Sequence, residues 1–129
     1  MKVFVTGANG HIGSNIVRIL LQRGYEVAAL VRPTANLSSL EGLEIEKHIG
    51  DIRDVQSLIS ASQGCDVVIH GAAIYNMFAS TREEIVEPVL EGTAHIFEAM
   101  AKNKIQRLVY TSSIAAVGFS KSPDLHFPS

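Results

Sequence analysis

The segment Thr6-Gly7-Ala8-Asn9-Gly10-His11-Ile12-Gly13 carries three glycines spaced three residues apart, and it decides the fold. A β-branched apolar run precedes it and apolar residues at helical spacing follow it, so the segment is predicted to lead from a strand into a helix. Gly7 would permit the tight turn, Gly10 would let a pyrophosphate approach the backbone, and Gly13 would let the helix pack closely on the sheet. The free N–H groups of the helix N-terminus would face phosphate oxygens. The segment therefore predicts a dinucleotide-binding loop.

Short β-branched runs alternate with longer helical stretches through the rest of the chain, as expected of repeated β-α units that feed a parallel sheet. Most of these runs are apolar on both faces, which is typical of strands covered by helices on both sides. We expect an α/β fold with a doubly wound, Rossmann-like parallel sheet, truncated after its fifth strand. The expected strands are residues 2–6, 26–31, 44–49, 66–70 and 107–111.

Three helices are expected between these strands. The first covers residues 12–23, and Gly24 after it suits the left-handed conformation that often ends a helix. A shorter helix follows Asp54, a residue type that caps helix N-termini. A long amphipathic helix precedes the fifth strand and contains Pro88 in its first turns. Residues 33–40 allow only one irregular turn of helix.

The composition indicates one globular domain, because 129 residues with 47% apolar content suffice for one core and leave little room for a second. We expect a dinucleotide-binding domain over residues 1–118 and an irregular tail over residues 119–129. The formal net charge is −2 without a long basic run, which argues against nucleic acid or membrane as partner. The single cysteine, Cys65, and five histidines without metal-ligand spacing argue against a metal site. The absence of a signal-like apolar start indicates a cytoplasmic protein.

Beyond the glycine loop, the chain resembles the extended short-chain dehydrogenase/reductase family, which includes NAD-dependent epimerases and dehydratases. Four further segments occur in the family's order: Gly50-Asp51-Ile52-Arg53-Asp54, His70-Gly71-Ala72-Ala73, Pro88-Val89-Leu90-Glu91-Gly92-Thr93, and Tyr110-Thr111-Ser112-Ser113 followed by Val117-Gly118. The third segment resembles the dihydroflavonol-reductase and aldehyde-reductase branch, where sugar epimerases tend to have an asparagine. The resemblance covers residues 1–118 and only the N-terminal, cofactor-binding half of the family's chain.

The glycine loop and the resemblance together define the candidate site. The resemblance implies that the segment at Asp51 contacts adenine, that Gly71 begins a turn along the cofactor, and that Ser113 is catalytic. The candidate cofactor-binding residues are Gly7, Asn9, Gly10, His11, Ile12, Gly13, Arg32, Asp51, Ile52, Gly71, Ala72, Ala73, Thr111 and Ser112.

The residues at the end of the second strand bear on the choice of cofactor. An NAD site usually places an acid there, which accepts hydrogen bonds from the ribose hydroxyls and would repel a 2′-phosphate. This chain has Val31-Arg32 instead, and a guanidinium suits a phosphate. We expect NADP rather than NAD, although Arg32 is also compatible with a solvated loop residue.

In the family, the catalytic serine acts with a tyrosine that donates the proton and with a lysine, four residues after the tyrosine, that lowers the pKa of the tyrosine. The tyrosines here, Tyr25, Tyr75 and Tyr110, have no lysine at that spacing. We expect the cofactor-binding portion of an NADP-linked oxidoreductase acting on a carbonyl or secondary alcohol of a small molecule, inactive alone. The alternatives are the corresponding portion of a nucleotide-sugar epimerase or dehydratase, and a non-catalytic dinucleotide-binding sensor module.

The fifth strand bears on assembly. Leu108, Val109 and Tyr110 offer neither a proline nor an inward charge to protect a sheet edge. If the sheet stops there, its open N–H and C=O groups would invite another strand. We therefore expect a homo-oligomer formed through the fifth-strand edge, or marginal stability, unless residues 114–129 fold back to cover that edge.

Overall fold

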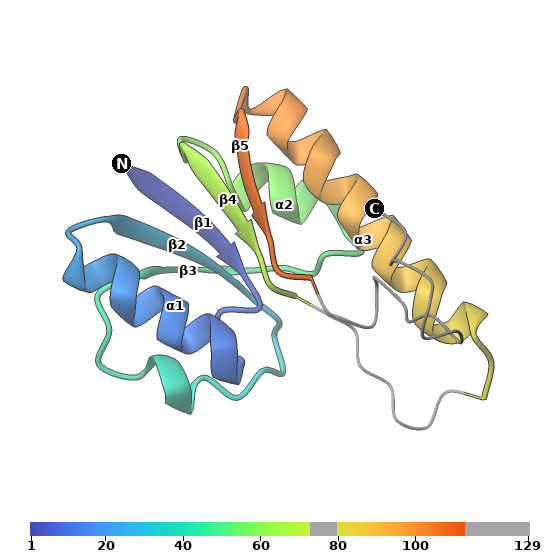
Figure 1. Cartoon of the computed structure of the whole chain (residues 1–129), viewed down its shortest axis with the longest axis horizontal. Coiled ribbons are helices and arrows are strands. Elements are labelled where there is room, and N and C mark those ends of the chain that lie inside the picture. Colours follow the sequence, from blue (N-terminus) through green and yellow to red (C-terminus); the bar gives the residue numbers. More distant parts are fainter. Residues whose placement is uncertain (73–79, 113–129) are drawn as a thin grey trace, which may run out of the picture.

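A computed structural model describes residues 1–72 and 80–112 of the chain (Figure 1). Its strands and helices alternate as the sequence predicts. The elements are β1 (Lys2–Thr6), α1 (His11–Gln22), β2 (Glu26–Val31), the 3₁₀ turn η1 (Ser38–Leu40), β3 (Glu46–Ile49), α2 (Val55–Ala61), β4 (Val67–His70), α3 (Glu83–Lys102) and β5 (Arg107–Tyr110). The expected tail and the boundary at residue 118 lie outside the described residues.

The five strands form one parallel sheet in the order β3-β2-β1-β4-β5. Helix α1 lies on one face of this sheet, and α2 and α3 lie on the other (Figure 1). The order of the strands reverses at β1, since the chain adds β2 and β3 on one side and β4 and β5 on the other. The doubly wound, Rossmann-like fold is therefore confirmed, and a switch point lies between β1 and β4.

The core consists of two apolar layers, one on each face of the sheet. Phe4 of β1 points into the layer that α2 and α3 cover, together with Leu58 and Ile96. Its neighbours Val3 and Val5 point into the layer under α1 and η1. Alternation sends successive side chains to opposite faces, so a central strand with both faces covered is apolar throughout.

The outer strand β3 departs from that expectation. It has the sequence EKHI, its residues are mostly exposed, and Ile49 is 71% exposed. An edge strand with charged side chains is protected against pairing with other chains. The strand also begins at Glu46 rather than at residue 44, because the Ile45 N–H bonds the Leu43 carbonyl in a turn.

Strands β4 and β5 are each one residue shorter than expected, because β4 begins at Val67 and β5 ends at Tyr110. Within the described part of the chain, β5 pairs only with β4, and its Val109 side chain is 52% exposed. Self-association through this strand stays a prediction.

The ends of the helices agree with the local chemistry of the sequence. Gly24 has φ +81°, and the following Tyr25 N–H bonds back to the Leu20 carbonyl, which closes α1. The Asp54 carboxylate accepts hydrogen bonds from the N–H groups of Gln56 and Ser57 at the start of α2. Pro88 lies in the second turn of α3, which begins at Glu83.

Candidate functional site

The glycine loop between β1 and α1 is shaped by close backbone approaches. Gly7 has φ +71°, and a Cβ added there would lie 2.7 Å from the carbonyl of Gly71 on the neighbouring strand connection. A Cβ at Gly13 would lie 2.0 Å from the Gly7 oxygen, well inside contact distance. A Cβ at Gly10 would meet only that oxygen, at 3.3 Å, among the described atoms. Gly7 and Gly13 are therefore required by packing, whereas Gly10 borders open space.

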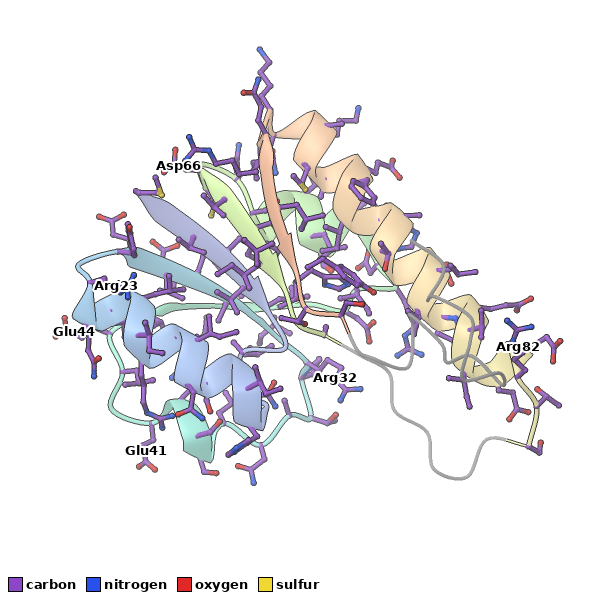
Figure 2. All side chains as sticks on the ribbon, in the orientation of Figure 1. Arg23, Arg32, Glu41, Glu44, Asp66 and Arg82 are labelled. Carbon is purple, nitrogen blue, oxygen red and sulfur yellow. The ribbon has the colours of Figure 1, made fainter. Side chains whose placement is uncertain are left out.

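That open space belongs to a cleft of about 300 Å³ at the carboxyl ends of the strands. It lies where the strand order reverses, the position at which doubly wound sheets bind their ligands. The cleft is lined by Gly7, Asn9, Gly10, Leu30, Arg32, Asp51, Ile52, Gly71 and Ala72. Arg32 lies beside the strand ends, and Arg23 lies at the opposite end of α1 (Figure 2).

Eight of the candidate residues line this cleft, and five others do not. Gly13 is buried beneath the loop, while His11, Ile12, Thr111 and Ser112 are exposed outside the lining. Ala73 and the candidate catalytic Ser113 lie outside the described residues.

Leu30 also lines the cleft and was not among the candidates. It lies near the carboxyl end of β2, on the face covered by α2 and α3. Alternation along β2 is the signal that places Leu30 on that face, since Ala28 two residues earlier belongs to the same layer.

Asn9 at the tip of the glycine loop is held by the segment that follows β2. Its side-chain amide donates to the Asn36 carbonyl at 3.3 Å, and its own carbonyl accepts from the Ser39 hydroxyl at 2.8 Å. Arg18 of α1 donates to the Ser39 carbonyl at 2.7 Å and ties that segment to the helix. These hydrogen bonds therefore hold the glycine loop, α1 and the η1 segment together beside the cleft.

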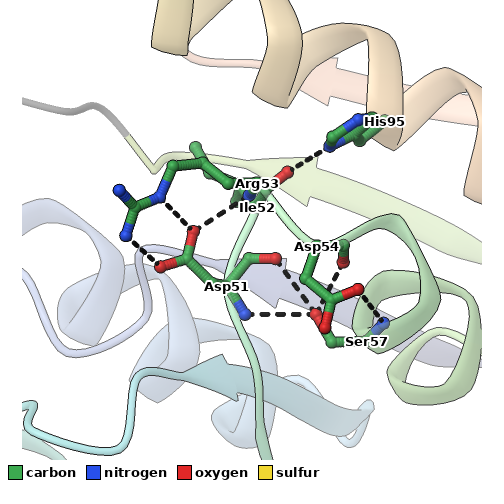
Figure 3. A network of polar contacts seen from close by, with 6 residues as sticks. All are labelled: Asp51, Ile52, Arg53, Asp54, Ser57 and His95. Carbon is green, nitrogen blue, oxygen red and sulfur yellow. Dashed lines mark hydrogen bonds and ion pairs between the residues drawn. The ribbon is translucent and has the colours of Figure 1, made fainter.

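The loop from Asp51 to Asp54 forms a second wall, and polar contacts hold it (Figure 3). The Ser57 hydroxyl of α2 accepts from the Asp51 N–H at 3.1 Å and lies 2.7 Å from the Asp54 carbonyl, to which it donates. On the α3 side, His95 Nδ1 donates to the Ile52 carbonyl at 2.8 Å. Two helices thus set the position of this loop.

Asp51 is engaged by its neighbour Arg53 through both carboxylate oxygens. Arg53 Nε donates to Oδ1 at 3.1 Å and Nη2 donates to Oδ2 at 2.8 Å, while the Arg53 N–H also donates to Oδ1. Hydrogen bonds from Arg53 are the main cause that lowers the pKa of Asp51, and the charge of Arg32 adds to them. Asp51 is therefore ionised at neutral pH.

A buried polar contact joins the ends of β1 and β4 beneath the cleft. The Thr6 hydroxyl accepts from the Ala72 N–H at 3.2 Å and lies 2.6 Å from Nδ1 of His70. Burial lowers the pKa of His70, so the ring is neutral at neutral pH. The imidazole also packs against the Tyr110 ring, with 5.3 Å between centroids. This contact positions the turn that begins at Gly71.

Residues 1–72 and 80–112 contain neither a helix long and apolar enough to cross a membrane nor a group of three His, Cys, Asp or Glu residues placed to hold a metal ion.

The family model described as the 3-beta hydroxysteroid dehydrogenase/isomerase family matches residues 4–126. The chain belongs to this family. The match confirms the resemblance to the extended short-chain dehydrogenases and reductases, because the relatives include a reductase of the dihydroflavonol type and the structural neighbours include epimerases.

The curated relatives include proteins much longer than this chain. Sterol demethylase protein B of Methylococcus capsulatus is 37% identical over 120 residues, which are 93% of this chain and 37% of that protein. A putative dihydroflavonol 4-reductase of Synechocystis is 42% identical over 115 residues, which are 89% of this chain and 33% of that protein. The chain thus spans about a third of the length of these relatives.

Two solved structures show the same fold with different cofactors. A UDP-glucose 4-epimerase from Stenotrophomonas maltophila with bound NAD and formylated UDP-arabinopyranose has a TM-score of 0.83 and 26% identity, covering 97% of this chain and 40% of its own. The yeast methylglyoxal/isovaleraldehyde reductase complexed with NADPH has a TM-score of 0.77 and 27% identity, covering 92% and 39%.

Proposed function

We propose that this chain is the cofactor-binding portion of an NADP-linked oxidoreductase that acts on a carbonyl or secondary alcohol of a small molecule. The observation that carries the proposal is the cleft at the switch point, where the glycine loop, Arg32 and Asp51 meet. Family membership and the NADPH-bound reductase neighbour support it.

The residues of the glycine loop fit a dinucleotide. Gly10 precedes α1 and presents no side chain to the cleft, and a Cβ at this position would extend into the space that a pyrophosphate needs. The first N–H groups of α1 begin beside this space and provide hydrogen-bond donors and a partial positive charge. When bound, the nicotinamide dinucleotide supplies hydride transfer.

Arg32 supports NADP over NAD. It lines the cleft immediately after β2, where an acid would accept hydrogen bonds from ribose hydroxyls. A guanidinium at that point binds a 2′-phosphate through charge-assisted hydrogen bonds. We also propose that the segment containing Asp51 and Ile52 contacts the adenine of the cofactor.

Catalysis is the part of the proposal that needs residues other than those of the cleft. Ser113 is proposed to contact the substrate oxygen, as the family resemblance implies. No tyrosine of the printed sequence has a lysine four residues later, so the general acid and its partner are missing from these 129 residues. We expect the 129-residue chain to bind cofactor without turnover.

The corresponding portion of a nucleotide-sugar epimerase or dehydratase is the second candidate. The similarity to the NAD-bound UDP-glucose 4-epimerase favours it. The choice of cofactor separates the two candidates, because Arg32 has no ribose-binding carboxylate beside it on β2.

Isothermal titration of the 129-residue chain with NADPH and NADH tests the proposal. We expect NADPH to bind more tightly, and Arg32→Ala to lower NADPH affinity about 10- to 100-fold, as the loss of a charge-assisted contact predicts. Arg23→Ala removes the same charge at the far end of α1 and should leave binding unchanged. Gly10→Val should abolish binding of both cofactors with a native far-UV spectrum. Equal affinity for the two cofactors, unaffected by Arg32→Ala, would contradict the NADP assignment.

A further inference from the structure

The pair Asp51 and Arg53 is the feature of the cleft that the proposed function leaves unexplained. Asp51 lines the same cleft as Arg32, and a quarter of its side chain is exposed. A carboxylate at this position opposes any ligand with an added phosphate, because like charges repel in a partly desolvated cleft. Arg32 and Asp51 alone would give this end of the cleft a net charge of zero.

Arg53 changes that balance. Its guanidinium binds both oxygens of Asp51, in the bidentate geometry that gives the strongest pairing between a guanidinium and a carboxylate (Figure 3). The three side chains together carry one net positive charge. Hydrogen bonds from Arg53 also hold the pKa of Asp51 below its ordinary range, so the pair stays ionised at neutral pH.

The side chain of Arg53 is not what holds the loop in place. Ser57 bonds the Asp51 N–H, His95 bonds the Ile52 carbonyl, and the Asp54 carboxylate caps α2. Among the described residues, the Arg53 guanidinium donates only to Asp51, and 60% of the side chain is exposed. Its removal should therefore alter the charge of the cleft without moving the wall.

We propose that Arg53 is a specificity-determining residue: by neutralising Asp51, it leaves the charge of Arg32 uncompensated and so favours a dinucleotide with a 2′-phosphate over one with a free 2′-hydroxyl. This inference rests on the proposed function and deepens it. It assigns the preference for NADP to two arginines, one that contacts the added phosphate and one that neutralises the opposing acid.

The test is a titration of NADPH and NADH into the full 129-residue chain and its variants Arg53→Gln, Asp51→Asn, the double variant and Arg53→Lys. Arg53→Gln should lower NADPH affinity about 5- to 10-fold and change NADH affinity less than about twofold. A loss of this size is expected when one positive charge near the 2′-phosphate is removed. The double variant should regain the wild-type ratio of NADPH to NADH affinity, because the charge of Arg32 is again uncompensated when both Asp51 and Arg53 are neutral. Arg53→Lys keeps the charge and should retain most of the preference.

Two controls sharpen the titration. Arg23→Gln removes one positive charge from the far end of α1 and should leave the ratio of the two affinities unchanged (Figure 2). Raising the salt concentration from about 0.05 M to about 0.5 M should shrink the effect of Arg53→Gln, since screening weakens interactions between partly exposed charges.

Equal weakening of NADPH and NADH in Arg53→Gln would overturn the inference, because a purely structural role predicts it. A double variant with an NADPH preference as low as that of Arg53→Gln would also overturn it, since Arg53 would then act on the nucleotide directly and not by neutralising Asp51. If the folded wild-type chain binds neither cofactor, the proposed function fails and the inference fails with it. If the wild-type chain binds both cofactors and only the selectivity pattern is absent, the inference alone fails.

Discussion

The two walls of the cleft are built by different physical means. The glycine loop is held by backbone atoms that approach so closely that side chains are excluded at Gly7 and Gly13. The loop from Asp51 to Asp54 is held by side-chain hydrogen bonds, one of which comes from His95 on α3, more than forty residues away. A steric requirement is visible in the residue type itself, whereas a hydrogen bond becomes visible only when its partner is located.

The difference has an energetic counterpart. A steric clash in a closely packed interior can be relieved only by shifting the backbone or by unfolding, and both cost much stability. A single hydrogen bond exchanged for water contributes only about 1 kcal/mol. Substitutions in the glycine loop should therefore cost much more stability than substitutions in the polar loop. Two predictions test this ordering, and a third concerns the buried contact beneath the cleft.

The largest effect is expected at Gly13. A Cβ in Gly13→Ala would lie 2.0 Å from the Gly7 oxygen, and we expect the free energy of unfolding to fall by at least about 3 kcal/mol. Urea denaturation followed by circular dichroism measures it. Gly24→Ala is the matched control, because φ is +81° there but an added Cβ meets no described atom within 4 Å. It should cost about 1–2 kcal/mol, the conformational penalty alone. Equal losses at the two glycines would contradict the steric account of the loop.

An intermediate effect is expected at Ser57, the centre of the polar loop. Ser57→Ala removes the acceptor of the Asp51 N–H and the donor to the Asp54 carbonyl, and should cost about 1–2 kcal/mol in the same assay. Ser60→Ala, at an exposed position of the same helix, should be neutral or slightly stabilising. A cost above that of Gly13→Ala would reverse the comparison between the two walls.

The smallest effect is expected for the buried contact between Thr6 and His70. Burial lowers the pKa of His70 in the folded state, so the unfolded chain binds more protons between the two pKa values. The contribution of His70 to the free energy of unfolding should therefore be largest above the unfolded-state pKa of about 6.5 and decrease as the pH falls below it. Urea titrations at several pH values between about 7.5 and 5.5 measure the slope.

Two variants assign that slope. His70→Gln removes the titrating group and should flatten it, while His11→Gln, at an exposed position, should leave it unchanged. A slope that survives in His70→Gln belongs to another group and would show that this contact does not couple stability to pH.

Much of the fold was predictable from local patterns. The β-branched runs, the helical spacing and the residues Gly24 and Asp54 placed the strands and helices close to their observed positions, and the alternation of elements predicted a doubly wound parallel sheet. The polar edge strand β3 was the exception. Its exposure depends on its being outermost in the sheet, which its own sequence indicates only weakly.

The candidate site divides in the same way. The candidate residues that line the cleft include Gly10 of the glycine motif and Arg32 and Gly71, which directly follow strands. His11 and Ile12 follow Gly10 directly in the chain but are exposed outside the lining of the cleft. Leu30 lines the cleft because of the face that it occupies on β2. Neighbours in sequence need not share a surface, since side-chain direction follows the period of each element.

The sequence by itself determined the order of elements, the tight passage from β1 into α1 and the presence of an arginine where an acid would select NAD. These features follow from local rules: side-chain periodicity, the space that a glycine leaves, and formal charge. The tertiary structure alone decided that Arg53 pairs with Asp51, that His95 and Ser57 hold the same loop from two helices, and that Arg32 and Asp51 share one cleft. These contacts depend on which strand ends meet at the switch point, because hydrogen bonds and charges act over a few ångströms in space, whatever the separation along the chain.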